Sequence, residues 1–333
     1  MPNRVSRDEL VLVTGVSGQD GFYFARRCLK QGLKVLGTSR KTVQESWRLQ
    51  VLSAYEGFQL YPVTDYSVCF LDGLFTRSQP GLVLHGASFR DIPRNEEESK
   101  EVFFTNCHLF ERLLNSVRRH SPHSRVLFLS SAEIFGAREG QVFDEASPLD
   151  PQNDYARAKV KGMEIARQFR QEGLFVACAI CFNHDSIFSP ADHLLKLVPR
   201  RLLKVKTGQS DKAVFYDTDI FRDWTHAEDM ASAFEKMLRH AEPLDLIVAS
   251  GQACRLKDFI HICCELIGID HSVVTTESQN GGPSYDRMAD SRRLQRLLQW
   301  QPRWRIHDLA AKMIAFEKYL MRRRRFETRV SVG

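Results

Sequence analysis

The chain has 333 residues, of which 43% are hydrophobic and 26% charged, and its formal net charge is +6. This composition is typical of a folded globular protein and excludes a disordered one, and the length suits one large α/β unit or two fused domains. No apolar run reaches the ~18 residues that span a bilayer, and the basic first residues precede no apolar stretch of a secretory signal, so we expect a cytoplasmic protein without membrane contact.

Short apolar runs rich in β-branched residues alternate with amphipathic stretches in the first half of the chain. The predicted strands are Leu10–Val16, Lys34–Thr38, Gln59–Val63, Gly81–His85, Arg125–Ser130 and Phe175–Phe182. The predicted helices between them are Gly21–Lys30, Lys100–Arg119 and Asn153–Gln171. This alternation is typical of βαβ units and predicts an α/β fold with a doubly wound parallel Rossmann sheet.

The first predicted strand runs into a glycine-rich turn with a helix directly behind it. A G-x-x-G-x-x-G pattern in this context is typical of a dinucleotide site, where the backbone approaches a pyrophosphate at the positive end of a helix. A merely structural turn is the alternative. The residues that we expect around the pyrophosphate are Gly15, Ser17, Gly18, Gln19, Asp20 and Gly21.

The second predicted strand is followed by Arg40 and Lys41, where an NAD enzyme would carry an acidic residue for the ribose hydroxyls. Two cations favour a 2′-phosphate and therefore NADP, although a solvated pair of loop residues would look the same. Asp65, after the third strand, could accept a hydrogen bond from the adenine amino group or cap the next helix.

The fifth predicted strand and the helix behind it carry candidate catalytic groups. Tyr155 and Lys159 have the i, i+4 spacing of one helix face, and a lysine ammonium beside a nicotinamide cation would lower the pKa of the tyrosine. Ser131 and Glu133 follow the strand two residues apart, so strand alternation would aim both at one ligand. Alternatively, Glu133 caps a turn or pairs with an arginine.

The C-x-x-C pair of Cys178 and Cys181 lies inside the apolar sixth strand, which favours buried free thiols of a reducing compartment over a redox or metal site. After about Asn183 the alternation stops. We expect helices at Ser186–Lys206 and Leu256–Ile267, a strand at Leu244–Ser250 and a polar loop at Thr275–Asp290.

The four arginines Arg322–Arg325 predict a solvated helix end. Nucleic-acid binding would need a broad basic face with aromatic residues among the charges, which this sequence does not show, so we expect none. We therefore divide the chain into an NADP-binding Rossmann domain, residues 1–183, and a mainly substrate-binding region, residues 184–333. Elements near residues 215–250 are expected to return to the sheet.

Three of these motifs together resemble the extended short-chain dehydrogenase/reductase family: the T-G-x-x-G-Q-D-G turn, the serine after the fifth strand, and Y-x-x-x-K. Within it the sequence is most similar to GDP-mannose 4,6-dehydratases, through Ser131-Ala132-Glu133, residues 182–186 and residues 222–229. The likeness runs from about Leu10 to Ala233.

The sequence also departs from that family at three places. The family's arginine pair after Phe-Asn-His is replaced by Ile187-Phe188-Ser189. Its Arg-Pro-Thr-Glu segment is absent, and Ser284-Tyr285-Asp286-Arg287 stands in that region. Its Ser-His-Val motif after strand four appears as Ser88-Phe89-Arg90.

The resemblance implies an internal redox dehydration of a nucleotide-activated hexose, in which NADP is regenerated in each turnover. It assigns proton abstraction from the C4 hydroxyl to Tyr155 and elimination of water to Glu133. It places Ala87 and His184 at the cofactor. It implies a homodimer or homotetramer formed through the helices Lys100–Arg119 and Asn153–Gln171. The substrate-binding candidates are Asn183, Lys196, Arg222 and Arg287.

Three other functions stay open. The first is a reductase or epimerase of 4-keto sugar nucleotides, which needs Tyr155 and Lys159 but not Glu133. The second is a dehydratase acting on another nucleotide sugar. The third is a non-catalytic NADP-binding protein, which would have no physical reason to keep Ser131, Glu133, Tyr155 and Lys159 together.

Overall fold

The structure is a computed structural model that describes residues 9–330 except 90–92, 94, 137, 139, 191–192 and 278–284. Its central sheet has seven strands within these residues, in the order β12-β7-β5-β4-β1-β2-β3. Every neighbouring pair is parallel. The strands are β1 (Leu10–Thr14), β2 (Lys34–Ser39), β3 (Phe58–Pro62), β4 (Leu82–His85), β5 (Arg125–Ser131), β7 (Val176–Cys181) and β12 (Asp245–Val248).

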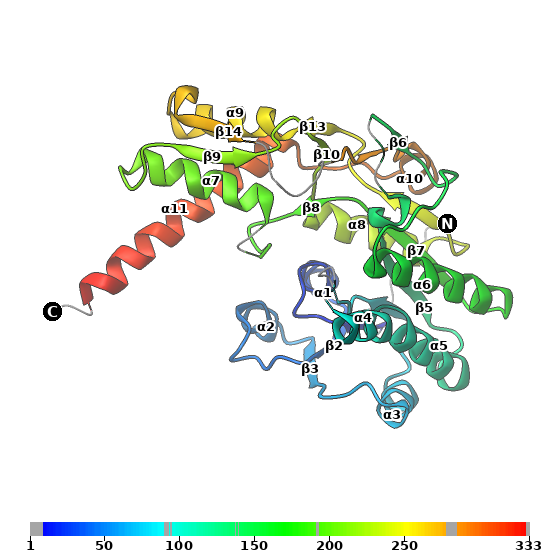
Figure 1. The fold of residues 1–333 in the computed structure, drawn as a ribbon. Coiled ribbons are helices and arrows are strands. Elements are labelled where there is room, and N and C mark those ends of the chain that lie inside the picture. Colours follow the sequence, from blue (N-terminus) through cyan, green and yellow to red (C-terminus); the bar gives the residue numbers. More distant parts are fainter. Residues whose placement is uncertain are drawn as a thin grey trace.

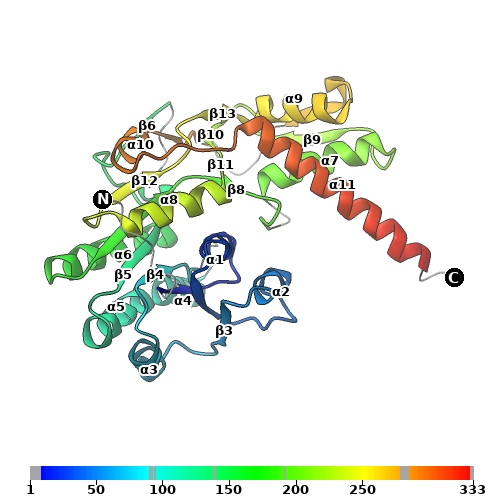
Figure 2. The same ribbon diagram turned by 180° about the vertical axis from the view of Figure 1, so that it is seen from behind.

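Helices cover both faces of this sheet, because alternate strand residues point to opposite sides and both sets are apolar (Figures 1 and 2). One face packs against α1 (Gln19–Lys30), α2 (Trp47–Ser53), α8 (Ala227–Arg239) and α10 (Arg292–Leu298). The other packs against α3 (Val68–Ser78), α5 (Leu109–His120) and α6 (Asp154–Gln171), with α4 (Glu96–Phe103) and the π-helical turn η1 (Phe104–His108) leading into α5.

The predicted doubly wound parallel sheet is therefore confirmed, with its order reversing between β1 and β4. The helices α2, α3 and α10 have no counterpart in the prediction. The helix expected over Ser186–Lys206 begins only at Leu194, because the preceding residues are occupied in a strand and a hydrogen-bonded loop.

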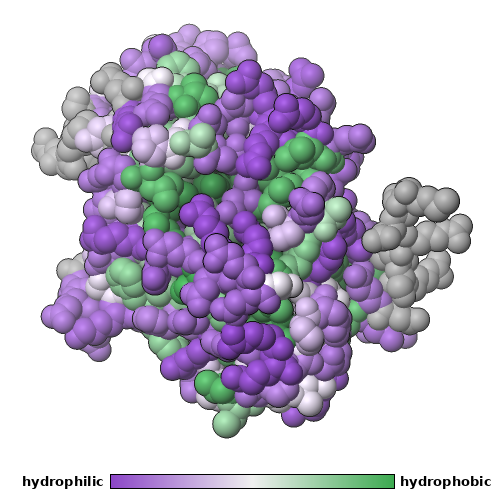
Figure 3. All heavy atoms as spheres, turned by 90° about the vertical axis from the view of Figure 1, so that its right-hand side faces the viewer, coloured by the Kyte–Doolittle hydropathy of each residue, from purple (hydrophilic) through white to green (hydrophobic). Residues whose placement is uncertain are grey.

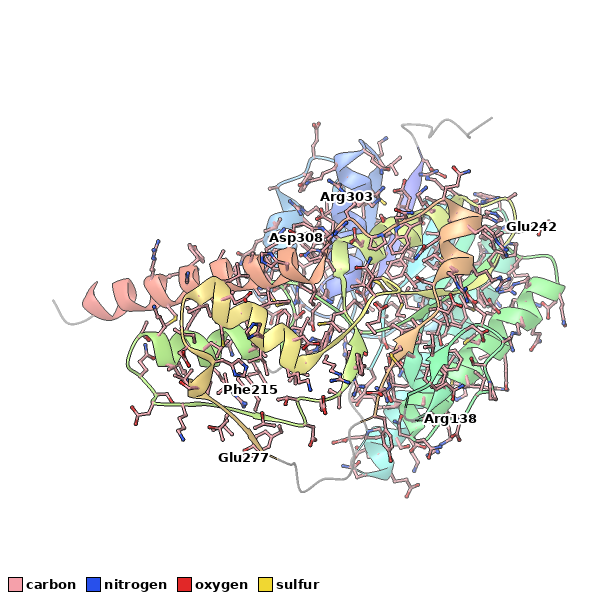
Figure 4. All side chains as sticks on the ribbon, turned by 90° about the horizontal axis from the view of Figure 1, so that it is seen from above. Arg138, Phe215, Glu242, Glu277, Arg303 and Asp308 are labelled. Carbon is pink, nitrogen blue, oxygen red and sulfur yellow. The ribbon has the colours of Figure 1, made fainter. Side chains whose placement is uncertain are left out.

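A third apolar cluster lies beyond the sheet and forms the core of the C-terminal region (Figure 1). It joins α7 (Leu194–Lys206), β9 (Ala213–Tyr216), α9 (Leu256–Ile267) and the long α11 (Ile306–Val330), which contains the four arginines. Figure 4 views this cluster from above and labels the buried Phe215 of β9 and Asp308 in the first turn of α11.

Short strand pairs tie this region together. β14 (Val274–Glu277) pairs with β9, and β15 (Met288–Ala289) pairs with β6 (Val142–Phe143). The segment predicted as a polar loop, Thr275–Asp290, therefore contains strand residues at both ends. Residues 278–284 between them lie outside the described residues. β10 (Phe221–Asp223) pairs with β13 (Ala253–Arg255), and β11 (Thr225–His226) pairs with β8 (His184–Asp185). Two 3₁₀ turns complete the elements, η2 (Ala132–Phe135) and η3 (His271–Val273).

Candidate active site

A pocket of about 800 Å³ lies at the carboxyl ends of the parallel strands. Ligands of open α/β sheets bind in this position, beside the point where the strand order reverses. The pocket is lined by the glycine turn and by residues of β5, η2, α6 and the segment around β8. Ten of the residues predicted from the sequence line it: Gly18, Gln19, Asp20, Ser131, Glu133, Tyr155, Lys159, Asn183, His184 and Arg287.

The glycine turn has room for backbone but not for side chains. Gly15 has φ +69°, and a Cβ atom there would lie 2.7 Å from the backbone nitrogen of Ala87. A Cβ atom on Gly21 would lie 2.7 Å from the carbonyl oxygen of Gly15. Gly18 caps α1 without a side-chain hydrogen bond, so the first N–H groups of the helix face the pocket. This cradle fits the pyrophosphate of a dinucleotide.

Asp20 and His184 form an ion pair across the pocket, with Nε2 of His184 2.8 Å from Oδ1 of Asp20. Burial alone would lower the pKa of His184, but the Asp20 carboxylate outweighs it and raises this pKa to about 9. The other ring nitrogen donates to the Phe182 carbonyl at 2.7 Å. At neutral pH the imidazolium therefore joins β8 to the start of α1.

Gln19 adds a second link between the glycine turn and the following segment. Its Oε1 accepts hydrogen bonds from Ser186 Oγ at 2.7 Å and Ser189 Oγ at 2.8 Å. The sequence did not predict a role for either serine at this site, because no local pattern relates a serine to a hydrogen-bond partner more than 160 residues away.

Arg48 of α2 is a further pocket residue that the sequence did not reveal. Its guanidinium donates to the Ser17 carbonyl at 3.0 Å and to the Phe188 carbonyl. Its Nε is buried and has no hydrogen-bond partner among the described residues. A cation held on the glycine turn, with one N–H unsatisfied, can bind a phosphate.

The loop after β2 carries Arg40 and Lys41 into solvent, and Arg40 lies 3.8 Å from Glu101. Ser39 fastens this loop, because its hydroxyl donates to Ser17 Oγ at 2.9 Å and accepts from the Lys41 backbone at 2.9 Å. Both cations are exposed, and Arg40 is in an exposed ion pair with Glu101.

Asp65 is exposed in the loop after β3, and the alternative that it caps the next helix is wrong. Ser67 is that cap and accepts from the Phe70 backbone at 3.3 Å. Ala87 donates its backbone N–H to Thr14 Oγ1 at 3.2 Å, which places it directly against the glycine turn. Arg90 lies outside the described residues.

Lys159 is buried below the pocket and held in place by two acceptors. Its Nζ donates to the Leu129 carbonyl at 2.9 Å and to Ser88 Oγ at 3.0 Å, and lies 5.5 Å from the centre of the Tyr155 ring. Asn153 starts this helix by accepting from the Ala156 backbone at 2.8 Å. Burial lowers the pKa of Lys159 to about 8.

The expected lowering of the Tyr155 pKa involves a nicotinamide cation as well as Lys159, and the protein alone does not produce it. Burial raises the pKa of Tyr155 well above its usual value, and the interaction with Ser131 offsets only part of that rise. Tyr155 is half-buried at the pocket wall, so a phenolate there would lose much of its contact with water. Formation of a phenolate therefore needs positive charge beyond that of Lys159.

Glu133 does not lie on the strand, so the alternation argument for its direction is wrong. β5 ends at Ser131, and Glu133 belongs to η2, whose first turn is closed by Ser131 Oγ accepting from the Glu133 backbone at 3.3 Å. Both side chains nevertheless line the pocket. The Glu133 carboxylate forms a two-bond ion pair with Arg287, with 2.9 Å between Nη2 and Oε2.

The four predicted substrate-binding residues differ in position. Asn183 and Arg287 line the pocket, and Asn183 Oδ1 is buried without a hydrogen-bond partner among the described residues. Arg222 lies behind Arg287, its neighbour across a β-bridge. Burial, together with the charge of Arg287, lowers the pKa of Arg222 to about 10. Ser284, in the same region, lies outside the described residues.

Lys196, the remaining candidate for substrate binding, lies in α7 and does not line the pocket. Its Nζ is buried, donates to the Ser189 carbonyl at 2.8 Å and lies 5.4 Å from the centre of the Phe316 ring. The side chain of Lys196 thus lies between the segment around Ser189 and α11.

The C-x-x-C pair is confirmed as part of a buried strand. Cys178 and Cys181 lie in β7, all eight cysteines of the chain are free, and burial raises the pKa of both thiols. No cluster of three metal-ligating side chains occurs among the described residues. In the same part of the chain, no helix combines the length and the apolar surface needed to cross a membrane.

Comparison with known proteins agrees with this geometry. The family model for GDP-mannose 4,6 dehydratase matches residues 12–313. The GDP-mannose 4,6 dehydratase of Drosophila melanogaster is 26% identical over 350 residues, covering 96% of this chain and 88% of that protein.

Two solved structures show the same fold. The dTDP-glucose 4,6-dehydratase of Bacillus anthracis, in complex with NAD, has a TM-score of 0.81 at 17% identity and covers 93% of this chain and 97% of its own. RMD from Pseudomonas aeruginosa, complexed with NADPH, has a TM-score of 0.76 at 19% identity and covers 93% and 99%. The family match extends over nearly the whole described chain. The chain belongs to the GDP-mannose 4,6-dehydratase family.

Proposed function

We propose that this chain is a nucleotide-sugar 4,6-dehydratase of the GDP-mannose type, which converts an NDP-hexose to an NDP-4-keto-6-deoxyhexose. One observation carries the proposal: Ser131, Glu133, Tyr155 and Lys159 line one pocket, which the glycine turn lines as well. The pocket holds an acid/base group beyond those that simple carbonyl redox chemistry needs.

The bound nicotinamide supplies a hydride acceptor that becomes the donor later in the same turnover. Tyr155 takes the proton of the C4 hydroxyl, which Ser131 orients, while C4 loses hydride. The resulting ketone acidifies C5, and Glu133 removes the C5 proton and assists departure of the C6 hydroxyl as water. Hydride then returns to C6 and a proton to C5, so the net change is loss of one water.

The positive charges of an oxidised nicotinamide and of Lys159 would together oppose the rise that burial causes in the pKa of Tyr155. This makes Tyr155 a base only when the cofactor is in place.

NADP is the proposed cofactor. The glycine turn, Arg48 and His184 would hold its pyrophosphate region, and Arg40 and Lys41 would hold the 2′-phosphate. Similar structures have been solved with NAD and with NADPH, which supports a nicotinamide dinucleotide in general. The choice of NADP rests on the two cations after β2, where the sequence offers no acid to the ribose.

A second candidate is a 4-keto sugar-nucleotide reductase or epimerase. It is favoured by the ion pair between Glu133 and Arg287, which satisfies the carboxylate within the protein and would suit a structural role. A dehydratase acting on a different nucleotide sugar differs from the first proposal only in substrate.

The decisive experiment is incubation with a panel of nucleotide sugars, without added NADPH, while product mass is followed for loss of one water. Glu133→Gln should keep cofactor binding and lose water elimination by roughly two orders of magnitude or more, the usual contribution of an acid/base group. Tyr155→Phe should block the first hydride transfer, so that no reduced cofactor forms. Glu164→Gln, on the exposed face of the same helix as Tyr155, is the matched control and should behave as wild type.

Full dehydratase turnover in Glu133→Gln would contradict the proposal. Stoichiometric consumption of NADPH by the wild type, with no loss of water, would assign the chain to the reductases and epimerases instead.

We further propose a homodimer or homotetramer built through α4, α5 and α6, located in the cytoplasm, where eight free cysteines would stay reduced. The exposed faces of these helices carry charges such as Arg112, Arg157 and Lys161, so the interface would be polar. The side of the molecule on which α5 and α6 lie in Figure 1 is mostly hydrophilic in Figure 3. Light scattering that shows only monomer at micromolar concentration would contradict the assembly.

A further inference from the structure

We propose that Arg287 exchanges partners, binding the Glu133 carboxylate in the free enzyme and the diphosphate of the nucleotide sugar in the complex. Substrate binding then releases the carboxylate for catalysis at the moment when the sugar arrives. This inference rests on the proposed function and makes Arg287 a positioning residue for Glu133.

The ion pair is built inside the pocket. Nη1 and Nη2 of Arg287 each meet one oxygen of Glu133, and the two side chains are only 17% and 27% exposed. Both residues line the space that the substrate would occupy. The Arg287 Nε is buried and without a hydrogen-bond partner among the described residues, so this guanidinium still has a donor to satisfy.

The backbone of Arg287 is fixed, which confines any exchange to the side chain. Its N–H donates to the Phe221 carbonyl at 3.0 Å, and its own carbonyl accepts from the Asp223 backbone at 3.1 Å. The guanidinium can therefore change partner by rotation of side-chain bonds, without breaking the strand contacts that hold this segment.

A second guanidinium lies next to this ion pair. Arg222 is the β-bridge neighbour of Arg287, and its electrostatic interactions include Glu133 and Asp286 as well as Arg287. Asp286 is engaged elsewhere, accepting from the Phe221 backbone at 2.8 Å. The cluster thus holds two guanidinium groups and two carboxylates, and of these four only Arg287 and Glu133 line the pocket. A diphosphate is the anion that a nucleotide-sugar substrate would bring, and arginine binds it with paired N–H donors.

The exchange has a chemical consequence at Glu133. A carboxylate that accepts one hydrogen bond on each oxygen from the same guanidinium faces that guanidinium and not the sugar. When the Arg287 guanidinium moves to the diphosphate, the Glu133 carboxylate is no longer held toward it and can turn to the sugar. The protein would thereby keep its acid/base group engaged until a substrate with a diphosphate is bound.

Binding of a nucleoside diphosphate tests the exchange without any turnover. We would measure the affinity of GDP by calorimetry in the presence of NADP, for wild type, Glu133→Gln, Arg287→Met and the double variant. Because Glu133 competes with the ligand for Arg287, Glu133→Gln should tighten GDP binding by about five- to tenfold, the size expected for a half-buried ion pair. Arg287→Met should weaken binding by about tenfold or more.

The double variant separates competition from simple repulsion. If Glu133 weakens binding only by repelling the diphosphate, Glu133→Gln would tighten GDP binding in the Arg287→Met background as well, and the exchange would be refuted. The exchange predicts no tightening there, because the contested cation is gone. Arg287→Lys should give an intermediate affinity and guards against a folding defect in Arg287→Met, and Glu164→Gln should bind GDP as wild type does.

Failure of the exchange and failure of the proposed function give different results. A wild type that binds GDP, with Glu133→Gln binding equally, overturns the exchange alone. A wild type that binds none of GDP, UDP and dTDP overturns the nucleotide-sugar function and the exchange with it.

Discussion

The ion pair between Asp20 and His184 predicts how the stability of the protein depends on pH. The pKa of His184 in the folded protein, about 9, lies above the 6.5 of an ordinary histidine. A cation with a raised pKa stabilises the fold fully below its unfolded value, and this stabilisation disappears as the pH rises toward the folded value. The pair should therefore contribute most below about pH 6.5 and very little above about pH 9.

The magnitude follows from the same two values. A rise from 6.5 to about 9 corresponds to an upper limit of roughly 3.4 kcal/mol, since each pH unit is worth about 1.4 kcal/mol. The side chains of His184 and Asp20 are 16% and 26% exposed, so solvent screens part of the interaction. We therefore expect Asp20→Asn to lose about 1–2 kcal/mol of unfolding free energy near pH 6 and little near pH 9.

Urea unfolding of wild type and Asp20→Asn at about pH 6 and about pH 9 measures this difference. Wild type and variant must be compared at each pH, because other groups also make the stability depend on pH. Burial lowers the pKa of Lys159 to about 8, so the contribution of Lys159 to the unfolding free energy rises with pH in both proteins. His184→Gln should reproduce the effect of Asp20→Asn, and the double variant should add nothing further. A stability difference that stays the same at both pH values would refute the reasoning.

The cofactor site and the core give three further predictions. Replacing Arg40 and Lys41 by alanine should weaken NADP binding at least about tenfold more than NAD binding, in a fluorescence titration; equal affinity of the wild type for both would contradict it. Arg48→Met should instead weaken NAD and NADP alike by about tenfold, because its guanidinium lies at the glycine turn that both share; a selective loss of NADP would place Arg48 at the 2′-phosphate. Gly162→Ala should cost about 1–3 kcal/mol in urea unfolding, because its Cβ would lie 2.3 Å from Cζ of Phe128; an unchanged midpoint would show that the ring moves freely.

The sequence predicts those parts of the site that depend on residues close together in the chain. The glycine turn reveals itself because Gly15, Gly18 and Gly21 must stand at fixed spacing between a strand and a helix. Tyr155 and Lys159 share one helix face for the same local reason. The parallel sheet can be predicted from the sequence because its strands are apolar on both faces.

The rest depends on contacts between distant residues. Glu133 and Arg287 are 154 positions apart, and no local pattern relates an acid in one turn to a base in a late strand. Arg48 lies in a helix of seven residues, too short for its periodicity to stand out. Lys196 was expected to bind substrate, but its side chain is buried and its Nζ donates to the Ser189 carbonyl, a contact that the sequence of the helix does not reveal.

The position of β12 bears on how this protein could be recombined with its relatives. The chain leaves the sheet after β7, builds α7 and β9, and only then returns to add α8 and β12, which hydrogen-bonds along the free side of β7. A hybrid joined at residue 183 would have to pair β7 with the β12 of another protein, and a poor fit there would leave β7 as an open edge with unpaired backbone groups, a surface that recruits other chains and aggregates. Substrate preference would have to be transplanted as separate loops and strands at the rim of the pocket, with α8 and β12 left in their original host.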